Sequence, residues 1–240
     1  MESATVWFVT IGVLSLVIAF DLVMAILRRD KETTITESSI WTVIYVSAAI
    51  VFGILMPNWV ESPTARPEFF AGWLTEYALS VDNIFVFVII LARLKIDSKK
   101  QQLVLLLGII IALLLRGGFI AAGAAIISRF QSVFFIFGAF LIFTAIQLIR
   151  ESGHDEEVKE SRVETYLKSK GASTFTIALI SLGVTDLVFA LDSIPAIFGI
   201  TKDPYIVATT NIFALMGLRQ LYFLLQGLIA RLVYLSYGLS

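Results

Sequence analysis

Long apolar stretches separated by short polar connections make up most of this 240-residue chain. A helix needs about 20 apolar residues to cross about 30 Å of hydrocarbon, and windows of that length recur along the sequence. They predict about seven transmembrane helices, at about 6–27, 40–57, 70–91, 103–127, 133–149, 175–200 and 206–226. Another apolar stretch from Leu228 to Ser240 predicts a partial eighth helix, too short to span. The pattern therefore predicts an all-α polytopic membrane protein.

Lysine and arginine are distributed unevenly between alternate loops. One set of loops holds Arg28, Arg29, Lys31, Arg93, Lys95, Lys99, Lys100, Arg150, Lys159, Arg162, Lys168, Lys170 and Arg231. The other set holds only Arg66, Arg129 and Lys202. Because cytoplasmic loops carry the excess of positive charge, the N-terminus is predicted to face outside. Glu2 stands where a signal peptide would be basic, so the first helix is expected to remain uncleaved.

The amino-acid composition limits the kinds of binding site that this chain can form. The chain is 58% hydrophobic with a mean hydropathy of +0.89, and its net charge of -1 argues against a nucleic-acid partner. It contains no cysteine, and His154 is its single histidine. Disulfides, thiolate sites and multi-histidine sites are therefore excluded within this chain. A bound metal would be held mainly by oxygen, which suits Mn²⁺, Mg²⁺ or Ca²⁺.

Two acidic motifs lie inside apolar segments, TEYALSVDNI at Thr75–Ile84 and TDLVFALDSI at Thr185–Ile194. Both read Thr, an acid, five residues, Asp, Asn or Ser, and Ile. The motif acids are Glu76, Asp82, Asp186 and Asp192. Each carboxylate at mid-membrane costs about 2.5 to 3.5 kcal/mol, so such residues are candidates for an ion or proton pathway. Their duplication indicates a site at a repeat interface.

The duplicated motifs divide the chain into a predicted repeat one, 70–149, and repeat two, 175–240, after two N-terminal helices in 1–69. Each repeat has an odd number of crossings, so the two should be inverted three-helix repeats. Residues 150–174 are interpreted as a solvated cytoplasmic linker with a surface helical turn at Glu164 and Lys168. Arg116 and Arg219 occupy matched positions in the helices that follow the motifs, which supports the repeat.

The spacing within each motif limits how its two acids can meet. Residues six apart lie about 120° apart around an ideal helix, so Glu76 and Asp82 share one ion only if the helix bends or helices cross there. In repeat two, Pro195 cannot donate to the carbonyl of Leu191, which predicts a break beside Asp192.

Charge in the apolar segments is unbalanced. Asp21 and the four motif acids face two arginines, which leaves three negative charges to be met by a cation and protons. An alternative is that Arg116 and Arg219 each pair with one acid and only pin helices together. Asp21 lies near Arg28 and Arg29, which favours a helix-end role. Asn211 is either a ligand or an interhelical hydrogen-bonding residue.

The segments EYALSVDNIFVF, DLVFALDSIPAIFGIT and NIFALMGLRQLYFLL resemble the TerC family of bacterial membrane proteins, over about Phe69 to the end. That family is named for tellurium resistance, is placed with the LysE-like transporters and is associated with manganese export. The resemblance implies an inner-membrane location and a closing helix after the matched YGLS. It also implies metal ligands at Glu76, Asp82, Asp186 and Asp192, with Asn83 and Asn211 in second rank.

Together these observations predict an exporter of divalent metal cations, most of all Mn²⁺, with a midplane carboxylate site and proton coupling. Its expected partners are the bilayer, the transported metal and protons, with no obligatory cofactor; homo-oligomers and membrane-protein partners stay open. The chain has no HExxH or GxSxG motif and is not expected to be an enzyme. The alternatives are a non-transporting scaffold or metal-delivery subunit and a Ca²⁺ transporter.

Overall fold

The computed structural model describes residues 3–27, 34–130, 135–136, 138–139, 141–144, 146 and 162–238. All regular structure in this part of the chain is helical. The elements are α1 (Ala4–Leu27), α2 (Ile35–Leu55), the short η1 (Met56–Asn58), α3 (Ala65–Arg93), α4 (Ser98–Arg129), α6 (Arg162–Ser169), α7 (Thr174–Ile200), α8 (Pro204–Met216) and α9 (Leu218–Gly238). Five of these helices, α1 to α4 and α7, are long and apolar enough to cross a membrane. The predicted all-α polytopic fold is confirmed.

Most predicted spans agree with observed helices, but the region 206–226 does not. It is interrupted at Gly217, between α8 and α9, and α9 then continues through the predicted boundary before Leu228. The prediction failed there because apolar residues run through both helices, so hydropathy marks no break. The predicted span 133–149 lies largely outside the described residues.

Polar side chains fix where several helices begin. Thr34, Asp97, Ser173 and Asp203 each accept a hydrogen bond from a backbone N–H in the first turn of α2, α4, α7 and α8, respectively. Such N-caps satisfy amides that have no partner within the helix. In α8 the cap is followed at once by Pro204, whose fixed φ suits the first helical position.

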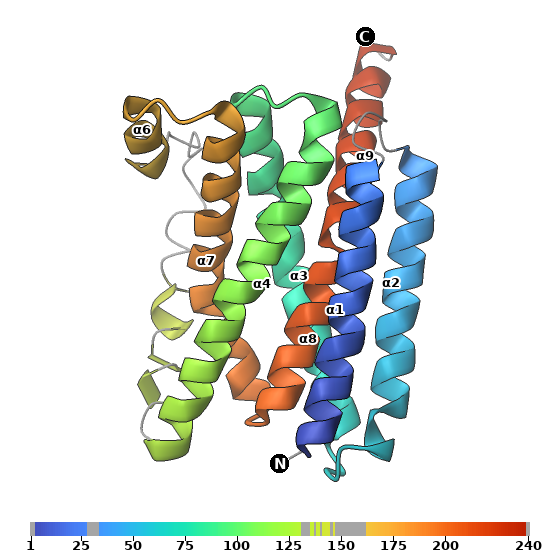
Figure 1. Cartoon of the computed structure of the whole chain (residues 1–240), viewed down its shortest axis with the longest axis vertical. Helices are drawn as coiled ribbons and strands as arrows, with labels where there is room; N and C mark the ends of the chain where they lie inside the picture. The colour runs from blue at the N-terminus through green and yellow to red at the C-terminus, as the bar shows by residue number, and fades with distance from the viewer. Residues whose placement is uncertain are drawn as a thin grey trace.

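The long helices run roughly parallel or antiparallel to one another, and the chain alternates between two ends of the bundle (Figure 1). The described basic residues of the lysine-rich and arginine-rich loops lie at the upper end in this view, from Arg93 to Lys100 and from Arg162 to Lys170. The start of α3, the end of α4 and the connection from α7 to α8, which carry Arg66, Arg129 and Lys202, lie at the lower end. The two loop sets are thus separated as the charge pattern requires, and which end faces the cytoplasm stays a prediction.

Four elements form the centre of the bundle, with α3 packed on α8 and α7, and α4 packed on α7 and α8. Small residues permit close approach at these crossings. A Cβ at Gly72 of α3 would lie 3.0 Å from Thr210 of α8, and one at Gly123 of α4 would lie 3.0 Å from Phe198 of α7. The first helix of each predicted repeat therefore packs against the second helix of the other, although the repeat itself stays a prediction.

Two apolar layers lie above and below a polar level in this centre. The upper layer includes Ile109 of α4 and Leu182 of α7, and the lower layer includes Ile120 of α4 and Ala190 of α7. Arg116 lies between the two layers on α4, and Asp186 lies between them on α7. Charged side chains are thus held at mid-bundle with apolar packing on both sides.

The linker helix α6 confirms the predicted helical turn, but its acid is not solvated. Glu164 is buried and accepts hydrogen bonds of 2.5 and 2.6 Å from Nη2 of Arg93 at the end of α3. A surface interpretation missed this because the partner is 71 positions away in sequence. The ion pair holds the end of the linker against the helical bundle.

Candidate functional site

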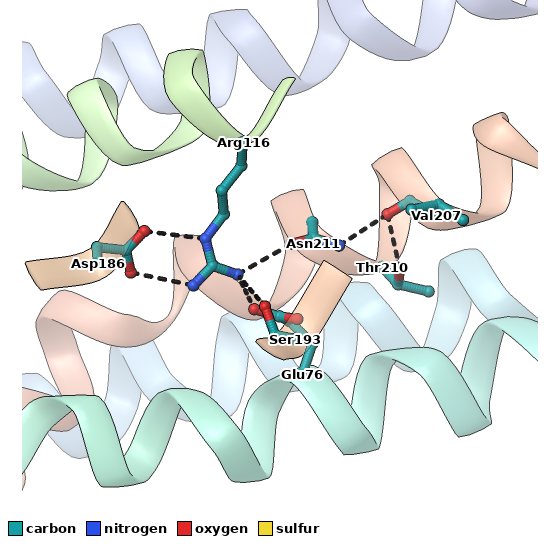
Figure 2. Close-up of polar contacts among 7 residues, drawn as sticks. All are labelled: Glu76, Arg116, Asp186, Ser193, Val207, Thr210 and Asn211. Carbon is teal, nitrogen blue, oxygen red and sulfur yellow. Dashed lines mark hydrogen bonds and ion pairs between the residues drawn. The ribbon is translucent and has the colours of Figure 1, made fainter. Parts of the chain in front are cut away.

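Arg116 is the centre of a buried polar cluster (Figure 2). Its Nε donates to Oδ2 of Asp186 at 2.9 Å, and its Nη2 donates to Oδ1 of the same carboxylate at 3.1 Å. Its Nη1 forms an ion pair with Oε1 of Glu76. The bidentate contact with Asp186 fixes the plane of the guanidinium, since two parallel N–H···O bonds define its orientation. One arginine of α4 therefore joins the first acids of both motifs, on α3 and α7.

Two neutral side chains complete the surroundings of Nη1. It donates to the amide oxygen of Asn211 at 3.0 Å and lies 3.4 Å from Oγ of Ser193. The Asn211 amide nitrogen donates to the carbonyl of Val207 at 3.0 Å, one turn earlier in α8. That bond orients the amide so that its oxygen faces Arg116, as Figure 2 shows. Side-chain oxygens of Glu76, Asn211 and Ser193 thus converge on a single nitrogen from three helices; we call this set, with Asp186, the oxygen cage.

Helical periodicity explains which residues reach the cage. Glu76 shares a buried face of α3 with Gly72 and Ser80, each four residues away, and with Asn83, seven residues away. On α7, Asp186 and Ser193 are seven residues apart and both are buried. Residues seven apart in a helix are nearly eclipsed, so each motif presents its first acid and its Asn or Ser together.

The cluster carries more negative than positive charge. Glu76 and Asp186 oppose the single guanidinium of Arg116, and all three side chains are almost completely buried. Oε2 of Glu76 and Oγ of Ser80, one turn along α3, have no hydrogen-bond partner among the described residues. A buried charged or polar atom without a partner is costly, so this level of the bundle can accept a further cation or a proton.

The second acids of the motifs do not join the cage. Asp82 is exposed, on a stripe of α3 with Phe85 and Ile89, and Asp192 is half-buried. Neither carboxylate has an ion pair or hydrogen bond within the described residues. Six residues of regular helix turn each second acid about 120° away from the first. In the described part of the chain, no group of three or more acidic or histidine side chains could hold a metal ion.

The predicted break that would have brought these acids together is absent. Helix α7 runs without interruption from Thr174 to Ile200, through Pro195. Asn83 is buried, but no hydrogen bond of the described residues connects it to the cage. The ligand roles of Asp82, Asp192 and Asn83 therefore stay predictions from sequence.

Arg219 occupies a position matched to Arg116 in the sequence, but its ion-pair partner is not an acid of either motif. Its Nη2 pairs with Oδ1 of Asp21, and both side chains are about nine-tenths buried. The helix-end role expected for Asp21 involved Arg28 and Arg29, which lie outside the described residues; in the described part of the chain its ion-pair partner is Arg219 of α9. A contact between positions 198 apart has no local sequence signal.

Ser193 is the cage residue that sequence reasoning did not select as a ligand. The signal available in the sequence was its position in the second motif, which matches that of Asn83 in the first.

The sequence also did not predict a cavity of about 690 Å³ between α1, α4 and α8. It is lined mostly by apolar side chains and reaches Arg116 and Asn211. It exists because α1 packs loosely beside α4, which hydropathy does not encode.

Comparison with known proteins places this arrangement in a family. The model of the integral membrane protein TerC family matches residues 61–240. An uncharacterized membrane protein of Mycobacterium tuberculosis strain H37Rv is 40% identical over 262 residues, which cover 99% of this chain and 66% of the relative. The protein Alx of Escherichia coli K12 is 31% identical over 255 residues, 95% of this chain and 79% of Alx.

The chain spans just under two thirds of the length of the mycobacterial relatives. No solved structure matches it. The family model covers all three motifs, including every residue of the oxygen cage. The resemblance seen in the motifs is therefore confirmed, and the chain belongs to the TerC family of integral membrane proteins.

Proposed function

We propose that this protein exports divalent metal cations, preferentially Mn²⁺, across the bacterial inner membrane in exchange for protons. The observation that carries the proposal is the oxygen cage around the guanidinium of Arg116. It combines one carboxylate from each motif with an amide and a hydroxyl oxygen, at the polar level between two apolar layers. Sites of this kind in transporters lie at mid-membrane, between repeats.

The donor chemistry fits a hard divalent cation. Carboxylate, amide and hydroxyl oxygens suit Mn²⁺, Mg²⁺ and Ca²⁺ better than the softer metals. The unpartnered Oε2 of Glu76 adds a second carboxylate oxygen on the same side chain. Arg116 fills the cage in the metal-free protein, as an internal counter-ion. A metal entering the cage displaces the guanidinium, since both positive groups require the same oxygens.

The apolar layers supply the two barriers that alternating access needs. Ile109 and Leu182 belong to the layer above the cage, and Ile120 and Ala190 to the layer below it. With both layers packed, apolar side chains cover the cage above and below, while the cavity between α1, α4 and α8 reaches Arg116 and Asn211 from the side. In the proposed orientation the N-terminus faces outside, so the upper layer closes the cytoplasmic path. The protein acts as a carrier and not as an enzyme.

A relative's name suggests another role. The name of Alx proposes that it is a membrane-bound redox modulator. These 240 residues contain no cysteine, so they offer no thiol for such a reaction. Any influence on redox balance by this part of the chain would follow from the metal it moves.

The test is transport by the purified full chain in proteoliposomes. We expect Mn²⁺ to accumulate against its concentration gradient when a pH gradient is imposed, and Ca²⁺ to accumulate less. Glu76→Gln and Asp186→Asn should each weaken Mn²⁺ binding by more than tenfold, about 1.4 kcal/mol, because each removes a charged ligand. Glu61→Gln, in an exposed loop, is the matched control.

The outcomes separate the alternatives. Unchanged Mn²⁺ affinity in both cage variants would disprove the site. Mn²⁺ binding that depends on the cage residues, with no Mn²⁺ transport when a pH gradient of either direction is imposed, would favour a metal-delivery or scaffold protein. Equal flux of both ions would remove the preference for Mn²⁺.

A further inference from the structure

A second buried polar cluster surrounds Asp21, where α1, α2 and α9 meet. Asp21 pairs with Arg219, and Tyr45 of α2 lines the same small cavity as this pair. Asp21 lies outside residues 61–240, which the family model matches. None of these three residues belongs to the oxygen cage.

The cluster contains donors that the pairing leaves unsatisfied. Nε of Arg219 and Nε2 of Gln220 are buried without a hydrogen-bond partner among the described residues. Both side chains line a cavity of about 20 Å³, together with Asp21, Glu37 and Gln102. A cavity of about 10 to 15 Å³ holds one water if that water finds two to four polar partners. This cavity meets both conditions, so it has room for one water beside Asp21.

The cavity also connects Asp21 to the upper end of the bundle. Glu37 is half-buried in the first turn of α2, which begins at that end (Figure 1). Of the described residues, α2 presents Tyr45 and Glu37 to this region and α9 presents Arg219. Helix α4 contributes the uncharged Gln102 with apolar side chains, and α8 contributes Met216. A proton entering at Glu37 can therefore reach Asp21 through one water.

We propose that Asp21 binds the proton that is exchanged for metal, at a site separate from the oxygen cage. This inference rests on the proposed function. The proton bonds to the carboxylate oxygen that Nη2 of Arg219 leaves, so the ion pair is lost as the O–H bond forms. When Arg219 pairs with Asp21 again, the proton returns to solvent. No other bond changes.

The chain connects this site to the cage through α8 and α9. Arg219 is the second residue of α9 and follows the interruption at Gly217. Asn211, eight residues earlier on α8, accepts a hydrogen bond from Arg116. Loss of the Asp21–Arg219 pair therefore acts on the short connection at Gly217 between α9 and the helix that holds a cage ligand. Coupling is reciprocal, so a metal that stabilises the paired state must release the proton from Asp21.

The experiment measures proton release when Mn²⁺ is added to the full chain in weakly buffered detergent. Relative to wild type, Asp21→Asn should release about one proton fewer per chain, and its Mn²⁺ affinity should depend less steeply on pH than that of wild type. Asp21→Asn/Arg219→Gln removes both charges and tests the same point if the single variant folds poorly. Glu61→Gln is the control and should match wild type. Unchanged proton release in both Asp21 variants would overturn the proposal.

Infrared titration of metal-free protein separates this inference from the proposed function. Acidification should produce a protonated-carboxyl band in wild type that is missing from Asp21→Asn and retained in Glu61→Gln. If wild type binds no Mn²⁺, the proposed function fails, and this band alone decides whether Asp21 takes up a proton. Identical spectra for wild type and Asp21→Asn would overturn the assignment.

Discussion

Arg116 and Arg219 occupy matched positions in the sequence, yet their surroundings differ. Arg116 contacts the first acid of each motif and two neutral oxygens, and each of its three nitrogens has a partner. Arg219 contacts Asp21 of α1, and its Nε has no partner in the described part of the chain. Arg116 therefore joins α3, α4, α7 and α8 at the centre of the bundle, whereas Arg219 joins α9 to the N-terminal helix α1.

The difference shows that two arginines at matched positions in the sequence can have different structural roles. A fully hydrogen-bonded guanidinium between two buried carboxylates is costly to remove, because it leaves both charges unpaired. A partly satisfied guanidinium beside a small cavity can leave its partner more readily. We therefore expect the Arg116 cluster to control stability and metal affinity, and the Arg219 cluster to control movement between α1 and α9.

The largest effect is expected from Arg116→Ala. Two buried carboxylates lose their counter-ion, so stability in detergent should fall by about 3 to 5 kcal/mol. Arg116→Lys should recover only part of this, because an ammonium cannot make the bidentate contact with Asp186. Thermal unfolding measures the loss, and Mn²⁺ should stabilise Arg116→Ala more than wild type. Arg129→Ala, at the exposed end of the same helix, is the control. A variant as stable as wild type would refute the pairing argument.

Arg219→Ala should cost less, about 2 kcal/mol, because it breaks one charged hydrogen bond at a less completely buried site. Combining Asp21→Asn with Arg219→Gln should restore most of the stability, since no unpaired charge remains. A double-mutant cycle on unfolding free energies gives the coupling between the two residues. If Arg219→Ala costs as much as Arg116→Ala, the contrast between the two clusters fails.

Asp82→Asn and Asp192→Asn test the acids that the cage leaves out. The motifs predict that each weakens Mn²⁺ binding by more than tenfold, about 1.4 kcal/mol. Folding stability should not fall in either variant, because neither carboxylate has a partner to lose within the described residues. Calorimetric metal titration and thermal unfolding of the same samples separate the two effects. Unchanged binding in both would restrict the ligands to the oxygen cage.

The smallest effect is expected from Asn211→Ala, about 1 kcal/mol of stability, through loss of one hydrogen bond to Arg116. Mn²⁺ affinity should fall as well, because a cage oxygen is removed. Thr210→Val is a suitable control, since among the described residues the Thr210 hydroxyl bonds only to the carbonyl of Val207 in its own helix. Equal metal affinity in Asn211→Ala and Thr210→Val would leave Asn211 with a packing role alone.

The sequence by itself was sufficient for the membrane class, the approximate positions of most helices and the family. These properties depend on local composition, since a long apolar segment must be helical in lipid to satisfy its own backbone groups. It also identified Glu76, Asp186 and Arg116 as exceptional, because charge within such a segment is costly wherever it lies. These three residues can be recognised as charges within apolar segments without knowledge of the fold.

Only the tertiary structure decided which charges meet. Arg116 and Asp186 are 70 positions apart, and Asp21 and Arg219 are 198 apart, so their contacts depend on how whole helices rotate and cross. Helix rotation also separated Asp82 from Glu76, because the intervening turns of α3 stay regular. The interruption at Gly217 was likewise invisible to hydropathy, because apolar residues continue on both sides of it. Local chemistry determines what each segment is, whereas long-range packing determines which side chains act together.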